Sequence, residues 1–194
     1  MNPVIHSCQL SILMNSSPKS MTTAITILLI LLGFVARLVP HPANVAPIAA
    51  IAIFGGLYLP ARYSIILPLT GLFLSDLVIG LYSLPIMLAV YGGFAVTGGL
   101  ALVARRRKSL GTVVGATLGG AVIFYLLTNG AVWAFGTMYP HTLSGLFESY
   151  RMAIPFFRNS LIGDFFYVSI LVGAYEMVTL TVRRLRQQSA EEQA

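Results

Sequence analysis

LPIMLAVYGGFAVTGGLALVARRRKSLGTVVGATLGGAVIFYLLTN, residues 84–129, places two apolar blocks on either side of a run of four cations at 105–108. Each block, 84–104 and 109–129, has about the 20 residues that a helix needs to cross a hydrocarbon core of about 30 Å. Lys and Arg beside a span are retained on the cytoplasmic side. The stretch therefore predicts a hairpin of two membrane-spanning helices with a cytoplasmic turn.

The rest of the chain repeats this pattern. Of its 194 residues, 57% are hydrophobic and only 9% are charged, about a third of the charged fraction of a soluble domain. The chain has four more apolar blocks, and Pro40, Pro42 and Pro60 separate the first three of them. The blocks cover 21–39, 44–59, 63–81 and 160–182. We therefore predict an all-α integral membrane protein, with a six-helix transmembrane bundle over 21–182.

The cations predict the orientation of these spans. With a cytoplasmic N-terminus, nine of the twelve Lys and Arg residues lie on cytoplasmic segments, as the positive-inside rule requires. These nine are Lys19, Arg62, Arg105, Arg106, Arg107, Lys108, Arg183, Arg184 and Arg186. The predicted topology is N-in/C-in, with a disordered cytoplasmic lead over 1–20 and a basic-then-acidic cytoplasmic tail over 183–194.

The first block has a second interpretation, a signal peptide, because Lys19 precedes an apolar run of suitable length. No small-x-small cleavage site follows the run. Removing it would leave five spans and would put the basic turn and the basic C-terminal segment on opposite sides. A retained first span is the favoured interpretation.

Small residues recur at intervals of four within the hairpin. Gly111, Gly115 and Gly119 form one such row, and Gly93 belongs to another on the preceding block. Rows of small residues let helices approach closely in lipid. They predict tight packing of the two helices on each other, with a docking face for a partner subunit as the alternative.

Three acids lie inside predicted spans, where an ionisable group costs about 2.5 to 3.5 kcal/mol and usually faces a partner or a cavity. Asp76 and Asp164 are expected at one outer depth, together with Arg37 and Asn129. Glu176 lies nearer the inner side, where we expect a cytoplasmic Arg or a partner subunit to pair with it. A structural ion pair of Asp164 with Arg158 or Arg151 is as consistent with the sequence as ligand contact.

Two connections border this outer layer. In 37–44, two prolines and His41 precede a block of only about 16 residues, so that block is expected to start below the outer surface. The segment 130–159 has about twice the average aromatic density of the chain. We expect this outer segment to lie in the interface as short amphipathic helices or to fold inward as a lid, with an interfacial aromatic belt as the alternative role of its aromatics.

Catalytic motifs are absent from the sequence. It has no Walker sequence, no His-Glu-x-x-His and no Gly-x-Ser-x-Gly, so no enzymatic activity and no cofactor are predicted. Cys8, the single cysteine, excludes an internal disulfide. A metal site of His41 and His141 with Asp76 or Asp164 is a minor alternative. Anionic membrane lipids suffice as partners for the basic segments, without nucleic acid.

An ordered set of short motifs resembles a known family. They are PHPANVAPIAAIAIFGG at 40–56, LSD at 74–76, NGAVW at 129–133, MYP at 138–140, IPFFRN at 154–159 and GD at 163–164. The set is similar to an uncharacterised bacterial family of proposed transport proteins. That family is itself similar to the substrate-binding S components of energy-coupling factor (ECF) transporters. The resemblance covers about residues 33–178.

The resemblance implies an S-component-like fold in the bacterial cytoplasmic (inner) membrane. It also implies a vitamin- or micronutrient-sized ligand near the outer face, and uptake powered by separate ATPase and transmembrane coupling subunits. The residues that match the family motifs are His41, Asn44, Asp76, Asn129, Trp133, Tyr139, Arg158, Asn159 and Asp164. Two departures are Ser149, where the family often has cysteine, and Leu28, which interrupts the small-residue row common in the first helix.

Two functional hypotheses follow. The first is a substrate-capture transport subunit, in which Arg37, Arg151 or Arg158 would pair with an anionic group of the nutrient. The second is a non-transport membrane protein. It would be an enzyme on a lipid-linked substrate that uses Asp76 or Asp164 as acid or base, or a membrane assembly factor.

Overall fold

A computed structural model describes residues 18–191, which form six α-helices, one 3₁₀ turn and no strand. The helices are α2 (Pro18–Leu38), α3 (Ile48–Tyr58), α4 (Tyr63–Ile79), α5 (Leu84–Ala104), α6 (Leu110–Phe135) and α7 (Leu143–Glu191), with η1 (Arg105–Arg107) between α5 and α6. Four of them, α2, α5, α6 and α7, are long and apolar enough to cross a membrane. This confirms the all-helical prediction and is compatible with a multi-pass membrane protein. Most of the lead predicted over 1–20 lies outside the described residues, and α2 already begins at Pro18.

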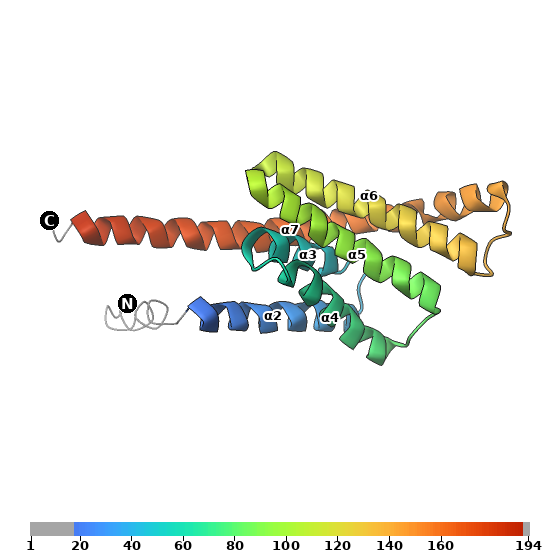
Figure 1. The fold of residues 1–194 in the computed structure, drawn as a ribbon, viewed down its shortest axis with the longest axis horizontal. Helices are drawn as coiled ribbons and strands as arrows, with labels where there is room; N and C mark the ends of the chain where they lie inside the picture. The colour runs from blue at the N-terminus through green and yellow to red at the C-terminus, as the bar shows by residue number, and fades with distance from the viewer. Residues whose placement is uncertain (1–17, 192–194) are drawn as a thin grey trace.

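Successive helices run in alternating directions (Figure 1). The N-terminal end of α2, the α3–α4 turn, η1 and the C-terminal end of α7 lie toward one end of the molecule, and the other connections lie toward the opposite end. We call the first the basic end, because Arg62, the cations at 105–108, Arg183 and Arg184 belong to it. The amino-acid sequence thus concentrates its positive charge on one side of the fold.

The shortest helix, α3, forms the centre of the fold. Its 11 residues span only about 16 Å, and each residue from Ile48 to Leu57 is buried. It contacts α2, α4, α5, α6 and α7. Gly56 allows this burial, because it faces Ala101 of α5 with no room for a side chain. The predicted span 44–59 is thus a buried core helix that begins only at Ile48.

The α5–α6 hairpin is present, but a different row of α6 faces α5. Gly93 packs against the Phe124 ring, and a Cβ at Gly120 would lie 2.8 Å from Thr97. A Cβ at Gly115, by contrast, would meet nothing within 4 Å, and Gly111 is equally open. Gly119 has only ordinary contact with Leu100. Four-residue spacing identifies a row of small residues, but it does not tell which of two adjacent rows faces the partner helix. Here the row that contains Gly120 and Phe124 packs on α5.

The segment 130–159, for which the sequence left short amphipathic helices or a lid open, is mostly helix. Helix α6 continues to Phe135, only 136–142 are non-helical, and α7 runs from Leu143 through Pro155 to Glu191. Tyr125 explains this arrangement, because its ring packs on Tyr150 and Phe157 with centroids 5.5 and 4.8 Å away. The Tyr125 hydroxyl also donates to the Tyr150 carbonyl at 2.6 Å. The first part of α7 therefore packs back on α6 as an antiparallel helix.

The last helix extends beyond the predicted span 160–182, because residues 183–191 of the predicted tail continue α7. At 49 residues the helix is about 74 Å long, and its C-terminal part extends past the body of the bundle (Figure 1).

A small cluster of contacts joins the basic residues 105–108 to α3 and α7. Tyr58 donates its hydroxyl to Glu176 at 2.6 Å. Lys108 Nζ lies 3.3 Å from the same carboxylate and 3.5 Å above the Tyr58 ring, and Arg105 donates to the Leu59 carbonyl at 2.7 Å. The partners of Glu176 are thus a lysine and a tyrosine of this chain, where the sequence led us to expect an arginine or another subunit.

Candidate ligand cavity

A cavity of about 500 Å³ lies between the α2–α3 connection and α4, α5, α6 and α7. Its volume falls in the range of small-molecule sites, about 300 to 1,000 Å³. The polar lining residues are Arg37, His41, Asn44, Thr97, Ser160 and Asp164, and the aromatic ones are Tyr82, Phe94 and Phe124. Several of these residues lie on the connections away from the basic end, so the cavity is on the opposite side of the fold.

One wall carries an ion pair between α2 and α4. Arg37 is in the last turn of α2, and its Nη1 lies 2.7 Å from Asp76 Oδ1. Tyr91 donates to the other carboxylate oxygen at 2.9 Å. Asp76 is only 1% exposed and does not line the cavity. Both oxygens of this buried acid are engaged, so Asp76 holds the wall together and does not itself face the cavity.

Arg37 nevertheless reaches the cavity. All three of its contacts, with Asp76, Ser75 and the Leu72 carbonyl, use Nη1. Within the described residues, Nη2 and Nε of this guanidinium have no hydrogen-bond partner. A guanidinium has five N–H donors. Arg37 can therefore offer donors to the cavity while its charge is compensated by Asp76.

Asp164 is the second buried acid, and its surroundings are different. It lies on α7, is 6% exposed and lines the cavity. It has no hydrogen bond or ion pair with any residue in 18–191. The ion pair with Arg151 or Arg158 that the sequence allowed is not formed. Arg151 instead pairs with Glu148 at 2.7 Å, and Arg158 is exposed.

The connection between α2 and α3 supplies further predicted residues. His41 and Asn44 both line the cavity. Asn44 has φ of 64°, a left-handed conformation that asparagine tolerates better than most residues. Asn159 of α7 donates to the Ala43 carbonyl at 3.2 Å, which ties this connection to α7 beside the cavity.

The remaining predicted residues lie outside the cavity, in the α6–α7 hairpin or on its surface, and two of them form hydrogen bonds within the hairpin. The Asn129 side-chain amide donates to the Tyr125 backbone carbonyl, and the Asn129 backbone carbonyl accepts from the Ser149 hydroxyl. Trp133 Nε1 lies 3.1 Å from the carbonyls of Pro140 and Thr142 in the connecting turn. The turn also contains Tyr139.

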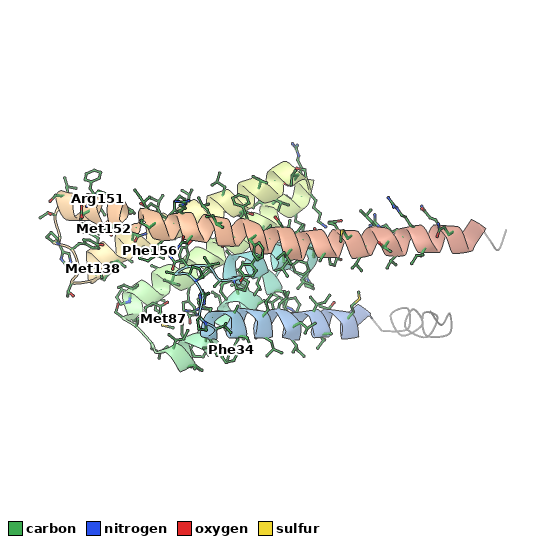
Figure 2. All side chains as sticks on the ribbon, turned by 180° about the vertical axis from the view of Figure 1, so that it is seen from behind. Phe34, Met87, Met138, Arg151, Met152 and Phe156 are labelled. Carbon is green, nitrogen blue, oxygen red and sulfur yellow. The ribbon has the colours of Figure 1, made fainter. Side chains whose placement is uncertain are left out.

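Arg151 lies near the tip of the α6–α7 hairpin (Figure 2). It is far from Phe34 of α2, which lies about one helical turn before the cavity residue Arg37. His141 is part of the same hairpin, where it contacts the Gly136 carbonyl and the Trp133 ring. His41 and His141 therefore do not meet. In the described part of the chain, no group of three His, Cys, Asp or Glu side chains could hold a metal ion.

Sequence reasoning missed the aromatic wall of the cavity. The rings of Phe94 and Phe124 lie 4.6 Å apart, but a phenylalanine within an apolar block gives no signal that separates lipid contact from ligand contact. Tyr82, in the α4–α5 connection, was also missed. Burial and the nearby Asp76 carboxylate raise the pKa of Tyr82 to about 12, so its phenol remains protonated at neutral pH and can donate.

The chain was compared with protein families, curated proteins and solved structures. The model of a family of unknown function, DUF6580, matches residues 17–188. This range contains every residue that lines the cavity. No curated protein and no solved structure matches the chain.

Proposed function

This chain belongs to DUF6580, a family of unknown function, and we propose that it is a membrane-embedded substrate-binding subunit for the uptake of a small nutrient. The observation that carries this proposal is Asp164, a buried acid that has no partner among residues 18–191 and faces a cavity of about 500 Å³. A buried polar group without a partner is costly, so its presence in a cavity is best explained by a ligand that pairs with it.

In this proposal the chain is a six-helix, S-component-like bundle in the bacterial cytoplasmic membrane, with both termini inside. The concentration of cations at the basic end supports this orientation. The cavity, on the opposite side, would then face outward and receive substrate from outside the cell. The short α3 and the non-helical connection before it fit a membrane location, because irregular backbone is tolerated at that depth where it lines a cavity.

The lining suits a vitamin- or micronutrient-sized molecule. Phe94, Phe124 and the aliphatic side chains would cover an apolar ring, and Arg37, Tyr82 and Asp164 would fix its polar edges. Arg151 and Arg158 are exposed and do not line this cavity, so they are not part of the proposed site.

Energy for accumulation would come from other subunits. In this proposal a separate ATPase and a transmembrane coupling subunit would supply it, as the resemblance of the motifs to the ECF-related family implies. Affinity purification from native membranes tests this part of the proposal. Recovery of an ATPase and a membrane coupling subunit would support transport, and recovery of an unrelated membrane complex instead would contradict it.

Thermal-shift screening of the purified chain against vitamins and their precursors tests the binding site. The cavity-filling variant Val90→Trp replaces a lining side chain on α5, and Val96→Trp makes the same change at an exposed position of that helix. We expect a hit to stabilise wild type and Val96→Trp but not Val90→Trp. Equal stabilisation of all three proteins would contradict binding in this cavity.

A further inference from the structure

The electrostatics of the cavity limit the kind of molecule that it can hold. Arg37 supplies a positive charge to the lining, and Asp164 is the acidic side chain among the lining residues. The Arg37 charge is compensated at 2.7 Å by Asp76, which lies behind the wall. Asp164 is therefore the lining acid that a cation would pair with, because no described residue supplies its counter-charge.

An anionic ligand would fit this distribution poorly. It would approach a guanidinium already bound to one carboxylate, inside a space that contains a second carboxylate without a partner. Like charges in a poorly solvated space repel strongly. A cation, in contrast, would supply the partner that Asp164 lacks, in a charge-assisted hydrogen bond.

The rest of the lining adds two features. The tilted pair of Phe94 and Phe124 offers aromatic faces, which attract both flat rings and cations. The unpartnered N–H groups of Arg37 and the protonated phenol of Tyr82 are donors, so they require an acceptor such as a hydroxyl or carbonyl oxygen on the ligand.

Resting on the proposed function, we infer that the substrate is a small aromatic or heteroaromatic base. Its protonated nitrogen would bind Asp164, its ring would lie against Phe94 and Phe124, and a neutral oxygen or ring nitrogen would accept from Arg37. The geometry thus assigns Asp164 as the residue that selects cationic over anionic substrates.

Three probes that share one ring and differ in charge test this assignment: tryptamine, tryptophol and indole-3-acetate. Tryptamine is a cation at neutral pH, because its amine titrates near 10 like that of lysine. We expect tryptamine to raise the melting temperature of the purified full-length protein in detergent. Tryptophol should raise it less, and indole-3-acetate should leave it unchanged.

Asp164→Asn should weaken tryptamine binding by about tenfold or more, because it removes the charge-assisted bond. Tryptophol binding should persist, which also shows that the variant is folded, and Asp164→Ser provides a second uncharged variant. Glu148→Gln is the matched control. It makes the same acid-to-amide change on α7, at an exposed residue paired with Arg151 outside the cavity, and should leave all three shifts as in wild type.

Four results would overturn the inference. They are preference for indole-3-acetate, equal binding of the three probes, no tryptamine binding up to about 1 mM, and unchanged tryptamine binding in Asp164→Asn. A nutrient that binds in the cavity but is anionic would overturn this inference while leaving the proposed function intact. Failure of every nutrient to bind would remove the proposed function as well.

Discussion

Asp76 and Asp164 are two buried acids, the first behind the wall of the cavity and the second in its lining, and their partners differ completely. Asp76 is held by Arg37 and Tyr91, so both of its oxygens are satisfied by the protein. Asp164 is bonded to no described residue and faces the open volume. The difference teaches that burial of an acid in an apolar chain does not by itself indicate a binding role. What distinguishes the two residues is whether the fold supplies the counter-charge.

Asp76→Asn should give the largest effect on stability. It leaves the mostly buried Arg37 without its counter-charge, which we expect to destabilise the protein by about 3 kcal/mol. Unfolding in mixed detergent micelles would measure the loss. The double variant Arg37→Met/Asp76→Leu should lose less, because no charge remains unpaired. A double variant less stable than Asp76→Asn would show that the ion pair is not the reason for the loss.

Tyr91→Phe should have a smaller effect of the same sign. It removes one hydrogen bond to the Asp76 carboxylate but keeps the ion pair, so a loss of about 1.5 kcal/mol is expected from the same unfolding measurement. A loss as large as that of Asp76→Asn would mean that Tyr91, and not Arg37, is the main partner of Asp76.

Asp164→Asn should act in the opposite direction in the absence of ligand. It replaces a lone buried carboxylate with a neutral amide, which should stabilise the protein by about 1 kcal/mol. Binding would be lost in exchange. Destabilisation comparable to that of Asp76→Asn would contradict the comparison, because it would indicate a structural partner for Asp164.

Glu148→Gln should have no resolvable effect. Glu148 and Arg151 form an exposed pair, and such pairs contribute little because solvent screens them. Its unfolding, measured beside that of Asp76→Asn, Tyr91→Phe and Asp164→Asn, provides the baseline for an acid-to-amide change on the same helix as Asp164. A clear loss of stability would show that the tip of the α6–α7 hairpin depends on this pair.

Much of the helical framework could be predicted from the sequence. The length of each apolar block indicates a helix, and the Lys and Arg residues between blocks mark where helices end. The form of the segment 130–159 could be narrowed only to short amphipathic helices or a lid, since its dense aromatics fit both. The spacing of seven between Tyr150 and Phe157 was the available signal that these rings share one helical face, and both pack on Tyr125.

The candidate site was predictable in part for a related reason. Sequence gives the depth of a residue along a helix but not its direction around the helix axis. It therefore grouped Arg37, Asp76 and Asp164 at one level without revealing that the first two pair and the third is free. Phe94 and Phe124 were missed because neither depth nor residue type separates a lipid-facing ring from one that lines a cavity.

Native mass spectrometry of the purified full-length protein tests the central claim, that the cavity opposite the basic end holds a small molecule. The account predicts a wild-type population that carries one bound molecule of vitamin-like size, absent from Val90→Trp and retained in Val96→Trp. A wild-type protein without such a molecule after purification from nutrient-replete cells, or the same molecule on Val90→Trp, would contradict it.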